Sequence, residues 1–167
     1  MVRALCVLIL SAASLQCGIV HAQKVAYGGL YVSGGSTSQN ATNTAAKVTG
    51  FTASQPADGG DRSIVANVSA DTISLLSGGV YLIQFDVTAE LGTADVQIYY
   101  TLRNGATAIT GARCKLEGEA TGVPTNTSMS ILFKPTAAAT LSVYHESETG
   151  TVAVTPTDMH LTVIRIQ

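Results

Sequence analysis

The sequence predicts an all-β protein: an antiparallel sandwich of two sheets, built from about ten strands. After residue 22, short runs of alternating apolar and polar residues recur every eight to fifteen residues. Residues that favour turns, namely Gly, Asn, Asp, Ser and Pro, separate these runs, and no stretch shows the periodicity of an amphipathic helix. This spacing is typical of a sandwich or a jelly roll.

The first 22 residues are expected to be a secretory signal peptide. Arg3 gives a short positive start, residues 4–20 are mostly apolar, and Val20-His21-Ala22 precedes the expected cleavage before Gln23. Polar residues interrupt the apolar run, which is also short for a membrane span. The domain is therefore expected to cover 23–167. The protein is expected to be secreted, or to be periplasmic or at the cell surface in a bacterium.

The composition of the remaining chain supports one domain with a core of its own. Removal of Arg3 changes the formal net charge from −2 to −3, so the charge gives no reason to expect nucleic acid or an anionic membrane as partner. Only 12% of the residues are charged. A surface of hydroxyl and methyl groups suits fibre, coat or assembly proteins better than monomeric enzymes.

Cysteine usage excludes an intrachain disulfide in the mature chain. Cys6 and Cys17 lie in the expected signal peptide, which leaves Cys114 alone. An exported chain without disulfides must be stabilised by its core, by oligomerisation or by both. Cys114 itself is expected to be a buried small hydrophobe rather than a nucleophile, and an intersubunit disulfide is left open.

Breaks in the pattern bound the expected strands. Residues 33–46 are uncharged and small, which predicts a long polar loop. A turn at 76–79 precedes the most regular strand, Asn104-Gly105 suits a type I′ hairpin, and Lys134-Pro135 ends a strand because proline cannot donate to the ladder. In chain order the expected strands are 26–32, 45–53, 63–68, 71–76, 79–91, 94–103, 106–116, 127–134, 139–147 and 159–166.

Two of these strands carry apolar residues on both faces. In 79–91 the odd-numbered positions from Tyr81 onward form an apolar core face, yet the opposite face begins with Val80 and Leu82. The last strand likewise places Ile164 and Ile166 opposite its core face. Since the outer face of a two-layer sandwich normally meets water, these residues indicate a surface that a partner covers.

Residues 79–105 resemble the C1q/TNF-like jelly-roll superfamily. Gly79-Val80-Tyr81, followed by Ile83 and Phe85, resembles the family's Gly-x-Tyr strand, and Ile98–Gly105 is similar to the next strand with its Asn-Gly turn. Leu161–Ile166 resembles the closing strand of the family. Within the family, this chain resembles the small bacterial and phage-type C1q-like heads more than the vertebrate members.

The resemblance implies a ten-strand antiparallel jelly roll that assembles as a homotrimer. In the family, the sheet that holds the Gly-x-Tyr strand and the final strand lines the threefold contact. The chain shows no collagen-like stalk and no clear calcium cluster. The candidate interface residues are Val80, Leu82, Tyr99, Ile164 and Ile166.

Residues able to carry chemistry are few, and each is better explained without it. Asp58-Gly59-Gly60-Asp61 could hold calcium but is typical of a polar turn. His145-Glu146 and Asp158-Met159-His160 match no zinc spacing. Glu117 and Glu119 could form a carboxylate pair, but adjacent like charges in a loop are usually solubilising. With no nucleophile elbow, HExxH or phosphate loop, we expect no enzyme, no metal and no cofactor.

Three of the five asparagines lie in N-glycosylation sequons, so the candidate acceptors are Asn40, Asn67 and Asn126. They are expected to carry glycans only if the host glycosylates exported proteins.

The function predicted from these observations is that of a secreted, non-enzymatic trimeric head in recognition, adhesion or extracellular structure. Its partner would be a receptor, a matrix or a surface glycan, held by several weak contacts at once. The alternative is a carbohydrate-binding β-sandwich. The absence of Trp counts against it, because sugar sites usually need exposed aromatic platforms.

Overall fold

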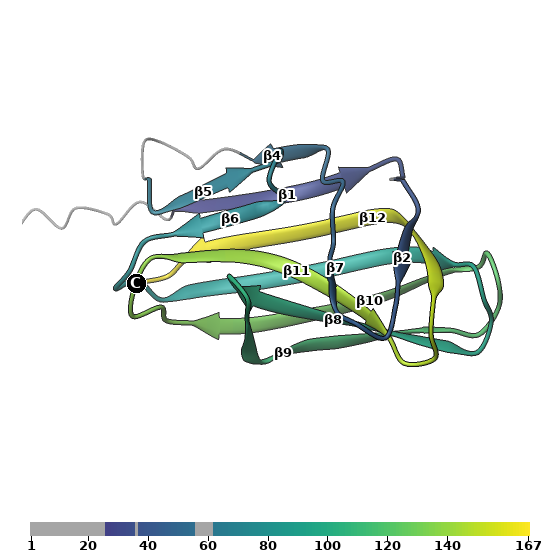
Figure 1. The fold of residues 1–167 in the computed structure, drawn as a ribbon. Helices are drawn as coiled ribbons and strands as arrows, with labels where there is room; N and C mark the ends of the chain where they lie inside the picture. The colour runs from purple at the N-terminus through teal and green to yellow at the C-terminus, as the bar shows by residue number, and fades with distance from the viewer. Residues whose placement is uncertain (1–25, 36, 56–61) are drawn as a thin grey trace, which may run out of the picture.

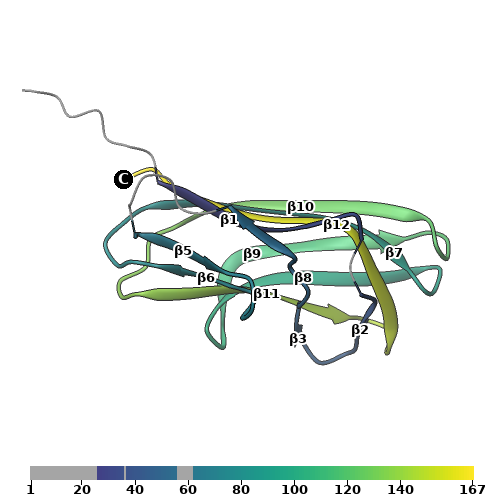
Figure 2. The ribbon, with the colours of Figure 1, turned by 90° about the horizontal axis from the view of Figure 1, so that it is seen from above.

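A computed structural model of the chain describes residues 26–35, 37–55 and 62–167. Two antiparallel sheets of six strands each pack face to face, which confirms the expected all-β sandwich (Figures 1 and 2). The expected signal peptide at 1–22 and the Asp58–Asp61 segment lie outside the described residues.

Sheet A has the strand order β10-β7-β12-β1-β4, with β2 paired to β12. Its strands are β1 (Tyr27–Ser33), β2 (Gln39–Ala41), β4 (Ala53–Gln55), β7 (Tyr81–Leu91), β10 (Pro124–Phe133) and β12 (Val152–Arg165). Sheet B has the order β5-β6-β11-β8-β9, with β3 paired to β11. Its strands are β3 (Ala46–Lys47), β5 (Ile64–Asn67), β6 (Thr72–Leu75), β8 (Val96–Asn104), β9 (Thr107–Gly118) and β11 (Ala139–Ser147).

The strand predictions fail where the chain is polar or irregular. The expected polar loop 33–46 contains the short strand β2. The expected strand 45–53 contains only the two-residue strand β3 and the first residue of β4, which belong to different sheets. The last strand begins at Val152 rather than at 159. A register shift between Pro156 and Asp158 interrupts its pairing with β7, because proline has no N–H for the ladder.

The core lies between the sheets and follows the period of two in β7 and β12. Tyr81, Phe85 and Leu161 are at most 1% exposed, and so are Ile98 and Tyr100 on the facing strand β8. The rings of Phe85 and Tyr100 pack with their centroids 5.4 Å apart. Each large side chain buried in this way contributes roughly 1.5–3 kcal/mol to folding.

The turn after β8 differs from the expected type I′ hairpin. Asn104 is the last paired residue of β8, opposite Thr107, so the two-residue loop is Gly105-Ala106. Gly105 has φ 57°, while neither Asn104 nor Ala106 has a positive φ, a pattern closer to type II′. Asn104 instead uses Oδ1 to accept a hydrogen bond from the backbone N–H of Thr140 at 3.0 Å.

The Gly-x-Tyr segment has a packing explanation in this chain. The ring of Tyr81 folds back over Gly79, and a Cβ built on that glycine would lie 2.8 Å from the ring Cζ. Tyr81 is 0% exposed and its hydroxyl donates to the Leu76 carbonyl at 2.9 Å, so the ring cannot move aside. Position 79 therefore requires glycine for space.

Replacing Gly79 by Ala is expected to lower the free energy of unfolding by about 1–3 kcal/mol, the usual cost of overpacking a filled site. Chemical denaturation measures this loss. Ser77→Ala, in the exposed turn two residues earlier, is the control and should change stability by less than about 0.5 kcal/mol. Equal stability of the Gly79→Ala variant and the parent would contradict the packing explanation.

Candidate functional site

The side chains of Val80, Leu82, Ile164 and Ile166 lie on the outer face of sheet A. Their neighbours Tyr81, Ile83 and Val163 point into the core, so strand alternation turns these four outward. Leu82 and Ile164 are register partners, and the Ile166 N–H donates to the Val80 carbonyl at 2.8 Å. The four residues are therefore neighbours on one surface, as the sequence predicts.

Two further apolar residues extend this surface across the sheet. Leu132 of β10 pairs with Leu82, and Tyr27 of β1 pairs with Ile164. One cross-strand row thus runs Leu132, Leu82, Ile164, Tyr27 over four strands. Leu132 is 64% exposed and Ile166 is 52% exposed. We call the following six residues the apolar band: Tyr27, Val80, Leu82, Leu132, Ile164 and Ile166.

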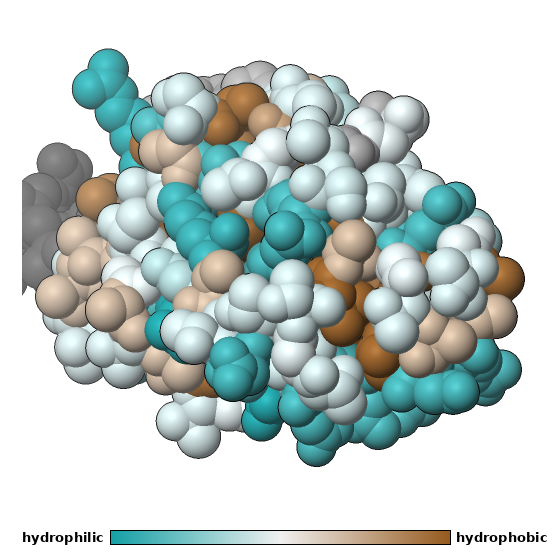
Figure 3. Space-filling model, turned by 45° about the vertical axis from the view of Figure 1, so that its right-hand side comes forward, coloured by the Kyte–Doolittle hydropathy of each residue, from teal (hydrophilic) through white to brown (hydrophobic). Residues whose placement is uncertain are grey.

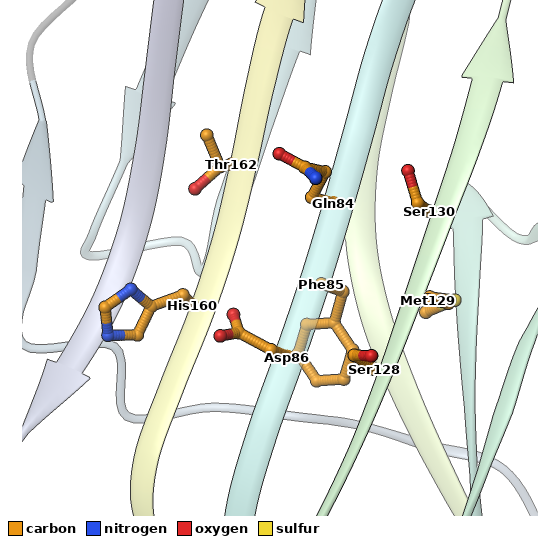
Figure 4. Close-up of a pocket in the computed structure, with 8 residues that line it drawn as sticks. All are labelled: Gln84, Phe85, Asp86, Ser128, Met129, Ser130, His160 and Thr162. Carbon is orange, nitrogen blue, oxygen red and sulfur yellow. The ribbon is translucent and has the colours of Figure 1, made fainter.

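Beyond the apolar band the same face is polar and hollowed. A depression of about 450 Å³ lies over the middle of β10, β7 and β12 (Figure 4). Small side chains form it, since Ser128, Ser130 and Thr162 leave space where larger residues would fill the face. We call it the polar depression, and its lining residues are Gln84, Phe85, Asp86, Ser128, Met129, Ser130, His160 and Thr162.

Ionisable side chains gather at one end of the polar depression. His160 Nε2 lies 2.9 Å from Asp158 Oδ1. Asp86 is the register partner of His160 and extends from β7 towards β12 in Figure 4. On the other side, the Tyr31 ring has its centroid 6.1 Å from that of His160. Asp86, Asp158 and His160 are all exposed in the single chain.

Tyr99 does not share this surface, which corrects its assignment to a common interface with the other four candidates. It lies on β8, on the outer face of sheet B, where its register partners are Lys115 and Glu146. Its ring stacks under the Arg113 guanidinium, whose carbon is 3.8 Å from the ring centroid. Its hydroxyl donates to Gln97 Oε1 at 3.1 Å. Alternation alone could not assign the outward residues of β8 to a particular sheet.

The outer face of sheet B pairs its own charges. Arg113 Nη2 lies 2.7 Å from Glu146 Oε1, and Lys115 pairs with Glu117. Arg103 stacks on the Tyr144 ring at 4.4 Å. These ion pairs and stacks alternate with polar side chains and leave no apolar row like that of sheet A on the described strands. On the side seen in Figure 3, brown residues form only small patches among white and teal ones.

His145 and His160 face different sides of the sandwich and do not act together. His145 is 3% exposed and faces the core beside Tyr100, while Glu146 points outward. His160 lies on the outer face of the other sheet. Among the residues that the structure describes, no group of three or more His, Cys, Asp or Glu side chains is placed to hold a metal ion.

The other candidate groups behave as structural residues. Cys114 faces the core from β9, and burial raises the pKa of its thiol, which favours the unreactive protonated form. Glu117 is exposed, forms an ion pair with Lys115, and accepts a hydrogen bond from Gln97 Nε2 at 3.4 Å. Glu119 lies beyond the end of β9 and is exposed. Burial also raises the pKa of the core residue Tyr100.

The three sequon asparagines are exposed but differ in their surroundings. Asn67 ends β5, and its Oδ1 accepts hydrogen bonds from Ser69 Oγ and the Ala70 N–H. Asn40 lies on the short strand β2. Asn126 lies on the outer face of sheet A, six residues along β10 from Leu132 and thus roughly 20 Å from it. A glycan at Asn126 would stand on the same face as the apolar band.

No helix in the described part of the chain is long and apolar enough to cross a membrane. No family model matches the chain, and no curated protein matches it either.

Solved structures identify the class of fold. Murine APRIL at pH 8.0 aligns with a TM-score of 0.55 at 15% identity, over 86% of this chain and 100% of that one. Eiger TNF from S. frugiperda gives 0.54 at 14% identity, over 86% and 92%. The PRD1 vertex protein P5 gives 0.50 at 13% identity, over 85% and 97%. The chain has the C1q/TNF-like jelly-roll fold that the Gly-x-Tyr and Asn-Gly strands resemble.

Burial of His145 makes the stability of the fold depend on pH. Desolvation lowers the pKa of this imidazole below its ordinary value of 6.5. The unfolded chain therefore binds more protons as the pH falls below about 6.5, and the free energy of unfolding decreases until the folded-state pKa is reached.

His145→Gln, which does not titrate in this range, is expected to flatten that dependence. Denaturant titrations at intervals between pH 7.5 and pH 5 compare the slopes of the two proteins. All other titrating groups are shared, so the difference between the slopes isolates His145. Parallel slopes would contradict the assignment of His145 as a neutral buried residue.

Proposed function

We propose that this chain forms a homotrimer through the outer face of sheet A and acts outside the cell as a non-enzymatic recognition or structural head. The apolar band is the observation that carries this proposal. Single exposed apolar residues are common, but a contiguous row over four neighbouring strands is typical of a surface that a partner covers.

The energetic argument favours a second copy of the chain as that partner. Each aliphatic side chain of the band that becomes fully buried contributes roughly 1.5–3 kcal/mol at most, and every copy in a closed ring adds the same set. The mature chain has Cys114 alone and so no intrachain disulfide. Association would supply part of the stability that small exported domains often obtain from disulfides.

The outer face of sheet B gives a second argument for assembly through sheet A. Sheet B presents ion pairs and arginine–tyrosine stacks that are satisfied in water, such as Arg113 with Glu146 and with Tyr99. Covering that face would desolvate charges for little gain. Threefold symmetry and an extracellular site rest on the family resemblance and on the expected signal peptide at 1–22.

A trimer of this kind would act by presenting three copies of the same loops. In each chain the connections at 92–95, 119–123 and 148–151 lie at the ends of the strands remote from the apolar band. Weak contacts by each copy would then add through avidity with a receptor, a matrix or a surface glycan.

Leu82→Glu tests the proposed surface directly. A carboxylate in the middle of the apolar band would be buried without a partner, so the variant is expected to dissociate to monomers. Sedimentation analysis should give a mass near three chains for the parent protein and near one for the variant. Val65→Glu is the matched control, because Val65 is 49% exposed on a strand of sheet B, and this variant should remain trimeric.

Circular dichroism would establish that both variants are folded. A parent protein that is monomeric at all concentrations would overturn the proposal and favour the carbohydrate-binding sandwich, which a glycan array then tests. A folded Leu82→Glu variant that stays trimeric would show that another surface mediates assembly.

A further inference from the structure

The face that assembly would cover contains an isolated group of ionisable residues. Asp86 comes from β7, and Asp158 and His160 come from β12. His160 Nε2 lies 2.9 Å from Asp158 Oδ1, and Asp86 is its register partner on the adjacent strand. Register partners in an antiparallel pair have Cβ atoms about 4.5–5.5 Å apart. The histidine therefore contacts one carboxylate, Asp158, and has a second, Asp86, opposite it on the adjacent strand.

The neighbouring strands bring no compensating charge to this group. β1 presents Tyr31, β10 presents Ser128 and Ser130, and β7 presents Gln84 beside Asp86. Other ionisable side chains at outward positions of this face lie further along the strands. Among the described residues they are Glu90, four positions from Asp86 on β7, Tyr27 in the apolar band, and Lys134, just after β10 and beside that band.

In the single chain this arrangement costs little, because water solvates all three side chains. Covering the face changes that. With His160 neutral, two carboxylates in every copy lose water without a cation beside them, which is unfavourable. With His160 protonated, Asp158 has a cation within contact distance, Asp86 has one on the adjacent strand, and the net charge of the group changes from −2 to −1.

We propose that the group Asp86, His160 and Asp158 links proton binding to assembly, so that the chains associate more tightly as the pH falls through the range in which histidine titrates. This inference rests on the proposed assembly through the outer face of sheet A. The covered state binds protons more strongly than the separate chain, and linkage then requires that acid favours the covered state.

The proposed effect of acid on assembly is opposite to its effect on folding through the buried His145. Acid weakens the folded subunit through His145, whereas acid strengthens the contact between subunits through His160. The two effects separate experimentally, because one is read as unfolding of the subunit and the other as dissociation of folded subunits.

Sedimentation equilibrium of the exported protein over a concentration series at pH 8.0, 7.0, 6.0 and 5.5 tests the inference. One proton taken up per subunit, three per trimer, changes the overall association constant of three chains by up to about a thousandfold per pH unit. We expect tighter association at pH 6.0 than at pH 8.0. His160→Gln should remain trimeric but lose this dependence, and Asp86→Asn should associate more tightly than the parent at pH 8.0.

Glu119→Gln is the matched control, because it removes one exposed carboxylate away from this face and should keep the pH dependence of the parent. A parent trimer whose association constant is the same at every pH would overturn this inference and leave the assembly intact. A pH dependence that remains in the His160→Gln variant would also overturn this inference and leave the assembly intact. Failure of the parent to associate at any pH would instead overturn the proposed assembly, and the proton linkage with it.

Discussion

The pairing of β7 with β12 is the constraint on which the rest of this structure depends. The two strands run antiparallel at the centre of sheet A, with partners from Tyr81 to Leu91 on one strand and from Arg165 to Val154 on the other. Because side chains alternate, this register places Phe85 beside Leu161 in the core and Leu82 beside Ile164 outside. A slip by one residue would exchange the two faces. The same register therefore determines both the core and the apolar band.

The two outer faces of the sandwich present different kinds of side chain to the solvent. Sheet B covers itself with ion pairs and with arginines stacked on tyrosines, which retain their interactions in water. Sheet A combines an apolar band with a depression lined by serine and threonine. In the proposed assembly, the apolar row would provide affinity for a second copy of the chain, and the hollowed polar positions would provide sensitivity to charge. This asymmetry is the reason why we place the proposed assembly on one face of an otherwise regular fold.

The regular parts of the fold could be predicted from the sequence, because the alternation of apolar and polar residues in a long strand shows which face meets the core. The odd-numbered residues of β7 are all buried as expected, and Val80, Leu82, Ile164 and Ile166 all face outward. The sequence did not single out Leu132 and Tyr27, because one outward apolar residue on a strand is common. Only the strand register shows that they lie beside Leu82 and Ile164. Strands β2 and β3 are too short to show a period. The polar depression depends on the absence of side-chain volume across three strands, which no single segment reveals.

Both ends of the described chain meet at one end of the sandwich. The Arg165 N–H donates to the Ala26 carbonyl at 2.8 Å, and in Figure 1 the C-terminus lies near the start of β1. Whatever is joined to either terminus would leave the molecule on the same side, next to Tyr27 and Ile166. A tether there would hold the head by its base and turn the connections 92–95 and 148–151 outward. A single attachment point would thus orient every copy in the same way and leave its far tip accessible.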